Sequence, residues 1–177
     1  MAGIEGLGYQ IARADGRCAA TGAELPPHAP IVVVLLEAPG DERLTRLEFA
    51  ADAWDHGARP ETGPDEGLFA TWRTVRPDPT AKADPFVDAG SLMELFESLA
   101  GADDRRRRVF RYVLALLLMR KKELVYEGQQ AGELILRRRG PKDQEREVYR
   151  VTDPGMDDEA IAAAVEQVSA VMSGDAS

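Results

Sequence analysis

The chain has 177 residues, of which 44% are hydrophobic and 30% are charged, a composition typical of a soluble globular protein and unlike that of a disordered chain. Its formal charge of -9 opposes general binding of polyanions, so a nucleic-acid role would need a local basic surface. The single cysteine, Cys18, excludes an internal disulfide, and the N-terminus lacks the apolar core of a signal peptide. We therefore expect a cytoplasmic protein.

The N-terminal part of the sequence predicts β-strands. Three apolar stretches, Pro30–Ala38, Arg43–Phe49 and Leu68–Val75, are separated by turns that contain proline or glycine. They indicate a β lobe over residues 1–76. Residues 77–90 hold three prolines and are expected to form an extended connector to a second part, residues 91–177.

The most apolar stretch of the chain is Tyr112–Met119, with eight consecutive apolar residues. It is too short to span a membrane, which takes about 20 residues. A helix that is apolar on all sides is typically surrounded by other elements, so we expect a buried helix from about Asp103 to Leu124. Asp103 and Asp104 precede it and can accept hydrogen bonds from its first amides. The apolar pattern of Ser91–Leu99 predicts a partner helix, which would make a helical hairpin.

The C-terminal part predicts a small antiparallel sheet followed by a helix. The stretches ELVYEG, ELILRRRG and REVYRVTD alternate apolar and polar residues, with a turn at Gly140–Asp143. After Pro154, the acids Asp157 and Asp158 can cap a last helix whose apolar stripe includes Val165 and Val168. The expected fold class is therefore α+β.

Basic residues are concentrated in the middle of the chain. Residues 101–150 carry 14 basic and 8 acidic side chains, whereas residues 151–177 carry 6 acidic ones and none that is basic. Arg105, Arg108 and Arg111 lie three apart, so on a helix they would share one side and could hold phosphates or carboxylates of a partner. The alternative is pairing with the chain's own acids, because a run of charges is usually a solvated surface. The candidate partner-binding residues are Arg105, Arg106, Arg108, Arg111, Arg137, Arg138 and Arg139.

Two short stretches have the spacing of zinc knuckles without the ligands. In CAATG, Cys18 and Thr21 stand where a knuckle has two cysteines, and in AADAW the same places are taken by Ala50 and Ala53. Zinc needs four donor atoms in a tetrahedron, and methyl groups donate nothing. We therefore expect a degenerate, metal-free zinc ribbon in which apolar packing replaces the metal and Cys18 is a small buried hydrophobe.

A family resemblance follows from these motifs. The knuckle-like stretches, together with FATWR, LFESL and RYVLALLLMRKKEL, resemble an uncharacterised bacterial family whose N-terminal half is zinc-ribbon-like. The resemblance covers most of the chain and is strongest over Leu92–Leu124. Members of that family carry cysteines at the knuckles, and this chain departs from them at Thr21, Ala50 and Ala53. The resemblance implies no activity, and the departures argue against a bound metal.

Signals for catalysis are weak. A rearranged metal site would have to combine Cys18 with His28, His56 and Asp52 or Asp55, whose spacing matches no recognisable site. The sequence has no P-loop, no His-Glu-x-x-His pair and no Gly-x-Ser-x-Gly elbow. We expect neither an enzyme nor a cofactor, and a metal-dependent enzyme built on Cys18 is the weakest hypothesis.

Two other functions are compatible with the sequence. The first is a non-catalytic protein-interaction or scaffold module of the cytoplasm, which holds a protein partner through a charged surface. The second is an RNA- or ribosome-associated factor that uses the basic segment 105–139, including Arg120–Lys122. The aromatic rings of Trp54 and Phe69 are expected in the core rather than stacked on bases, and for Trp72 both interpretations stay open.

Overall fold

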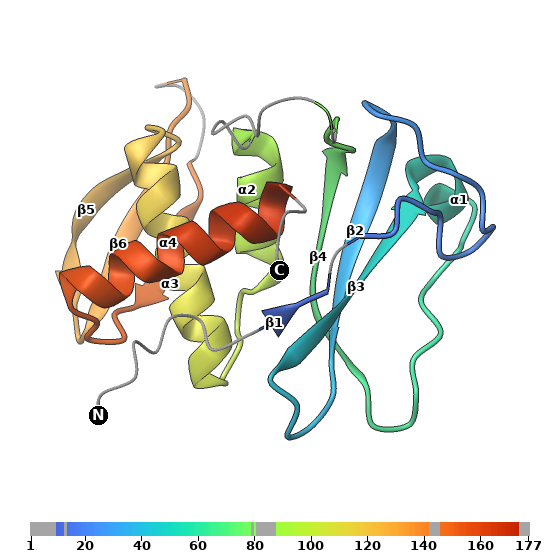
Figure 1. Cartoon of the computed structure of the whole chain (residues 1–177). Helices are drawn as coiled ribbons and strands as arrows, with labels where there is room; N and C mark the ends of the chain where they lie inside the picture. Colours follow the sequence, from blue (N-terminus) through green and yellow to red (C-terminus); the bar gives the residue numbers. More distant parts are fainter. Residues whose placement is uncertain (1–9, 13, 79, 81–87, 142–145, 174–177) are drawn as a thin grey trace. The chain divides into compact units, whose positions relative to one another are not determined.

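The computed structural model describes residues 10–12, 14–78, 80, 88–141 and 146–173, and it confirms the α+β fold class. The chain forms two compact units (Figure 1). Of the described residues, 10–98 and 169–173 belong to the N-terminal unit and 99–168 belong to the C-terminal unit. Most of the expected connector, including residues 81–87, lies outside the described residues, so the predicted domain limits at 76 and 91 stay a prediction.

A four-stranded sheet forms the centre of the N-terminal unit. Its elements are β1 (Gln10–Ile11), β2 (Pro30–Glu37), β3 (Arg43–Ala50), α1 (Ala51–Asp55), β4 (Gly67–Val75) and α2 (Ala89–Ser98). The strand order is β1-β3-β2-β4, with β2 antiparallel to β3 and β4, and β1 parallel to β3. The three predicted strands are confirmed to within one residue at each end. The sequence did not predict β1 and α1, because two and five residues are too few to show a period.

Strand β2 supplies the middle of this unit's core. Ile31–Leu36 are all buried, which explains why the stretch is apolar without alternation. Val32, Val34 and Leu36 pack with Phe49 on one side of the sheet. The ring of Trp54 meets that of Phe49 edge to face at 5.3 Å, so Trp54 belongs to the core as expected.

Helix α2 protects the free edge of β4. The backbone amide of Arg73 in β4 donates to Glu94 Oε2 at 2.9 Å, and Ser91 Oγ donates to the carbonyl of Arg73 at 2.8 Å. These two side chains of α2 therefore occupy backbone groups that would otherwise be open to another strand. Helix α2 begins two residues before the predicted Ser91, and Gly101, with a φ of 73°, follows its end as a left-handed residue.

An ion pair lies buried on this sheet. Arg46 donates to Glu48 Oε1 from Nε at 3.3 Å and from Nη2 at 3.0 Å, and the two side chains are 1% and 2% exposed. Arg46 also donates to the carbonyl of Val171 and lies 5.7 Å from the ring centroid of Trp72. Trp72 is fully buried, which settles its position in the core.

The C-terminal unit combines a helix with a three-stranded sheet. Its elements are α3 (Arg105–Arg120), β5 (Leu124–Gln130), β6 (Glu133–Arg138), β7 (Val148–Thr152) and most of α4 (Asp158–Ser173). The strand order is β5-β6-β7, antiparallel throughout, which confirms the predicted small sheet. The turn predicted at Gly140–Asp143 lies partly outside the described residues.

Helix α3 is the buried helix that the sequence predicts. Five of the eight residues of Tyr112–Met119 are buried and the other three are partly buried. Asp104 caps the helix by accepting from the amide of Arg107. The prediction that the helix reaches Leu124 was wrong: it ends at Arg120, and Lys122 has a left-handed φ of 63° before β5 begins. The predicted hairpin of α2 and α3 stays a prediction, since the two helices belong to different units.

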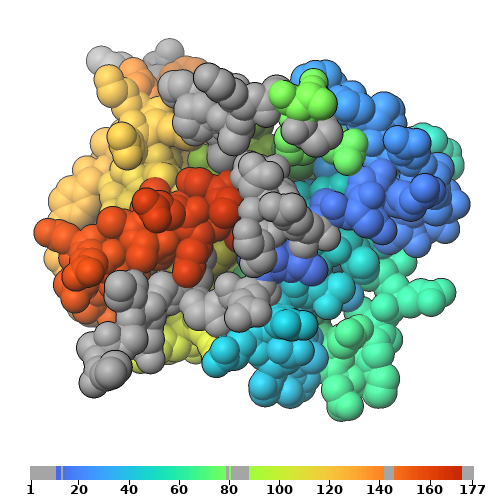
Figure 2. Space-filling view, viewed as in Figure 1, coloured from blue at the N-terminus to red at the C-terminus, as the bar shows by residue number. Residues whose placement is uncertain are grey.

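Helix α4 is amphipathic. Asp157 accepts a hydrogen bond from the amide of Ala160 at 2.8 Å, as its predicted capping role requires. Val168 and Met172 are buried, whereas Ala162 and Glu166 are exposed, and Figure 2 shows part of α4 at the surface. Among the described residues, no helix is both long and apolar enough to cross a membrane.

Candidate functional site

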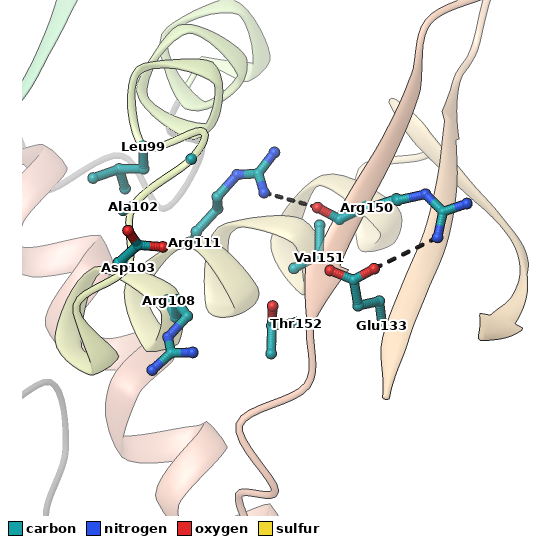
Figure 3. Close-up of a pocket in the computed structure, with 10 residues that line it drawn as sticks. Leu99, Ala102, Asp103, Arg108, Arg111, Glu133, Arg150, Val151 and Thr152 are labelled. Carbon is teal, nitrogen blue, oxygen red and sulfur yellow. Dashed lines mark hydrogen bonds and ion pairs between the residues drawn. The ribbon is translucent and has the colours of Figure 1, made fainter. Parts of the chain in front are cut away.

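The C-terminal unit contains a pocket rich in arginine (Figure 3). Its volume is about 290 Å³, and its walls come from the loop before α3, the first half of α3, the start of β6 and the end of β7. The lining residues are Leu99, Gly101, Ala102, Asp103, Arg108, Arg111, Glu133, Arg150, Val151 and Thr152. Two of them, Arg108 and Arg111, are candidate residues from the sequence, and their spacing of three places both on the side of α3 that borders the pocket.

Arg111 is held in place on the edge of β7. Its Nη1 donates to the carbonyl oxygen of Arg150 at 2.8 Å, and Figure 3 shows this contact across the gap between α3 and β7. The residue is partly buried. Burial lowers the pKa of Arg111 below its ordinary value, and electrostatic interactions with Tyr149 and Glu133 partly offset this effect. A guanidinium that has lost part of its hydration is a favourable partner for an incoming anion.

The guanidinium of Arg150 points away from that of Arg111 and toward Glu133 (Figure 3). Its Nη1 lies 3.5 Å from Glu133 Oε2. These two residues are neighbours across β6 and β7, because Glu133 pairs with Thr152 and Ile135 with Arg150. Their opposite charges therefore compensate each other at one end of the pocket.

Two other charged residues of the pocket, Arg108 and Asp103, differ from the paired Arg150 and Glu133. Within the residues that the structure describes, neither side chain makes a hydrogen bond or an ion pair, and both are exposed. The backbone cap of α3 is made by Asp104 instead, so Asp103 is not needed for it. The side chains of Arg108 and Asp103 can therefore respond to a ligand without loss of an internal contact.

The other candidate arginines lie outside the pocket. Arg105 and Arg106 are exposed on the first turn of α3, and Arg139 is exposed after β6. Arg137 pairs with Glu127 of β5, and Arg138 with Glu147 at 3.5 Å. These last two residues therefore pair with acids of the chain itself.

Sequence reasoning missed Arg150, Glu133 and Thr152 as pocket residues. Each stands in a predicted strand, but the sequence does not give the register that brings Glu133 opposite Thr152. Asp103 was not predicted to line a pocket. The one available signal was the exposed charge of Arg150 between two apolar residues of a strand, and such a residue is common on any sheet surface.

Cys18 lies beside the second knuckle-like stretch. Its side chain is 1% exposed, and the backbone amide of Ala50 donates to Sγ at 3.3 Å. Burial acts to raise the pKa of the Cys18 thiol, but hydrogen bonds from the side chain of Thr21 and from backbone amides outweigh it, so the pKa is lowered. Gly22 closes the turn with a left-handed φ of 69° and donates to the carbonyl of Cys18 at 2.8 Å.

The residues of the rearranged metal site are not assembled. His28 is an exposed turn residue with a φ of 65°, and His56 is an exposed residue whose Nδ1 lies 2.8 Å from the carbonyl oxygen of Asp52. Across the described part of the chain, no three side chains of histidine, cysteine, aspartate or glutamate are grouped so that they could hold a metal ion. No known protein family, curated protein or solved structure matches the chain.

Proposed function

We propose that the protein is a non-catalytic interaction module that holds a partner protein through an acidic group inserted into the pocket. The observation that carries this proposal is that both Arg108 and Arg111 line the pocket, with Arg111 partly buried and bonded to the carbonyl of Arg150 in β7. Arginine is the cation best suited to this role, because its planar fork of donors binds carboxylates and phosphates directionally.

Charge reversal at the pocket tests this function. The variant Arg108→Glu should reduce recovery of the partner from native extract roughly tenfold or more, because it places a like charge against the acidic group. The matched control is Arg105→Glu, which makes the same charge change on the same helix outside the pocket. Quantitative mass spectrometry of both pull-downs measures the difference. Equal losses for the two variants, or no specific partner for the wild type, would contradict the proposal.

A second candidate function is RNA or ribosome association. It is favoured by the exposure of Arg105, Arg106 and Arg108 along the first turns of α3. Phosphate contacts release counterions, so affinity for a generic single-stranded RNA should fall steeply with salt, with a slope of roughly 0.7 per phosphate contact in a double-logarithmic plot. Here Arg105→Glu and Arg108→Glu should weaken binding alike. Binding that is absent or insensitive to salt would remove this candidate.

We also infer that the N-terminal unit keeps the plan of a zinc ribbon without its metal. The inference is supported by the turn at Cys18–Gly22 and by the hydrogen bond from the amide of Ala50 to the Cys18 sulfur. Amides that donate to a ligand sulfur stabilise its thiolate form, as a metal knuckle requires. The apolar contact between Trp54 and Phe49 then takes the stabilising role that the metal ion has in a complete ribbon.

A further inference from the structure

At three of the four outer edges of the two sheets, other parts of the chain bind the strand's backbone. On β4, helix α2 binds both the amide and the carbonyl of Arg73. On β3, beyond the two-residue β1, the carbonyl of Glu48 accepts from the amide of Ala19 at 2.8 Å. On β7, the carbonyl of Arg150 accepts from Arg111 at 2.8 Å. Such contacts occupy groups that would otherwise pair with another strand.

The fourth edge, that of β5, differs (Figure 1). The amide of Arg139 donates to the carbonyl of Glu123 at 2.8 Å, so these residues form a hydrogen-bonded pair where the β5–β6 ladder begins. Such pairs alternate with non-bonded ones, whose backbone groups point away from the neighbouring strand. The amides and carbonyls of Leu124 and Tyr126 therefore point away from β6. Within the described part of the chain, no hydrogen bond reaches these outward groups.

Apolar side chains accompany this open edge. Val125 is 46% exposed and Tyr126 is 53% exposed, and the two point to opposite faces of the sheet because side chains alternate along a strand. A bulge between Tyr126 and Gly128 limits the regular part of the edge to Leu124–Tyr126. An open edge with exposed apolar side chains is a template for pairing with a further strand.

The same stretch of a second copy fits this edge. In an antiparallel pairing about a twofold axis at Val125, Leu124 faces Tyr126 of the second copy, and each such pair exchanges two hydrogen bonds. The groups that make these bonds are the outward amides and carbonyls. Val125 meets its own counterpart on one face, and on the other face Tyr126 lies beside Leu124 of the second copy. Apolar residues therefore face apolar residues at all three positions.

The charge distribution is compatible with a contact between two acidic chains. Residues 99–168 carry 14 basic and 13 acidic side chains, so the negative charge that makes two copies repel each other lies mainly in the rest of the chain. In the register centred on Val125, Glu123 would face Glu127 of the second copy. Glu127 already pairs with Arg137, and Arg139 stands opposite Glu123 in the ladder, so this row of four residues has no net charge.

We propose that β5 pairs with β5 of a second copy, in an antiparallel register centred on Val125, and that this joins the two C-terminal sheets into one. The inference goes beyond the proposed function and does not depend on it. A second copy supplies the apolar and charged complement of this edge without residues from any other protein. The joint strand order would be β7-β6-β5-β5-β6-β7, so the pockets beside the two β7 strands stay open and offer a partner two sites.

Disulfide trapping tests the register. Val125→Cys places two thiols in a non-bonded antiparallel pair, where Cβ atoms lie about 4.5–5.5 Å apart and need little adjustment to form a disulfide. The matched control is Val148→Cys on β7, whose valine is 58% exposed and so at least as accessible. With dissolved oxygen and a copper–phenanthroline catalyst, Val125→Cys should form linked dimers at least roughly tenfold faster than Val148→Cys. The wild type should form none, because Cys18 is buried.

Sedimentation of variants without a new thiol tests the association itself. The average mass of the wild type should rise with concentration, and amide hydrogen exchange at Leu124 and Tyr126 should slow in parallel. Val125→Lys should remain monomeric, because two lysines would meet at the axis, whereas Val148→Lys should behave like the wild type.

Equal trapping rates for the two cysteine variants, or equal effects of the two lysine variants, would overturn the proposal. Thermal unfolding of each variant confirms that it is folded. None of these substitutions changes a residue that lines the pocket, so the result leaves the pull-down test of the proposed function unaffected.

Discussion

Replacing Arg46 by methionine is expected to lower the free energy of unfolding by about 3–5 kcal/mol, the cost of removing one partner of a buried ion pair. The side chain of Glu48 is 2% exposed, and within the described residues its Oε2 has no hydrogen-bond partner. The Nε of Arg76 lies 3.8 Å from this oxygen. Without Arg46, Glu48 Oε1 would lose the two hydrogen bonds that it accepts from Nε and Nη2 of Arg46. The carbonyl of Val171 in the last turn of α4 would lose a donor as well.

Urea denaturation followed by tryptophan fluorescence measures this change, because Trp72 lies beside Arg46. Arg43→Met is the matched control: Arg43 begins the same strand but is exposed, so its replacement should cost at most about 0.5 kcal/mol. The double variant Arg46→Met with Glu48→Leu should recover much of the lost stability, since no charge is then left buried. Similar stability for Arg46→Met and Arg43→Met would contradict the interpretation.

The Arg46–Glu48 pair also illustrates what sequence reasoning could not reach. In RLTRLEF, Arg46 and Glu48 stand two residues apart and therefore share one side of the predicted strand. The strand is correct, but that side is covered, and the two residues satisfy each other there. Alternation fixes which residues share a face, while the elements that cover a face come from distant parts of the chain.

In the helices and the pocket too, some features follow from neighbouring residues and others depend on distant parts of the chain. The burial of Tyr112–Met119 and the cap at Asp104 depend on neighbouring residues, so they could be predicted. The relation of Arg108 and Arg111 also follows from helical spacing alone. The rest of the pocket depends on Arg150 and Glu133, which meet α3 only because of the pairing of β6 with β7. A single sequence does not give that pairing.

If the proposed zinc-ribbon plan is correct, three substitutions should create a metal site in the N-terminal unit. The variant Thr21→Cys, Ala50→Cys, Ala53→Cys would have four thiols, with Cys18 as the fourth, and should bind one zinc ion. Sulfur ligands of tetrahedral zinc lie about 3.8 Å apart, given zinc–sulfur distances of about 2.3 Å. The 3.3 Å from the Cys18 sulfur to the amide of Ala50, and the hydrogen bond from the Thr21 side chain, place both neighbouring positions within such reach.

Zinc binding to the folded variant should raise its stability by about 4 kcal/mol when free zinc exceeds the Kd a thousandfold. Elemental analysis and thermal unfolding, both under reducing conditions, measure the stoichiometry and the gain. The wild type should contain no stoichiometric zinc, because Cys18 alone supplies one of four ligands. Adding Cys18→Ala to the triple variant is the matched control, and it should weaken zinc binding. A folded four-thiol variant without bound zinc would show that the two turns do not face a common centre.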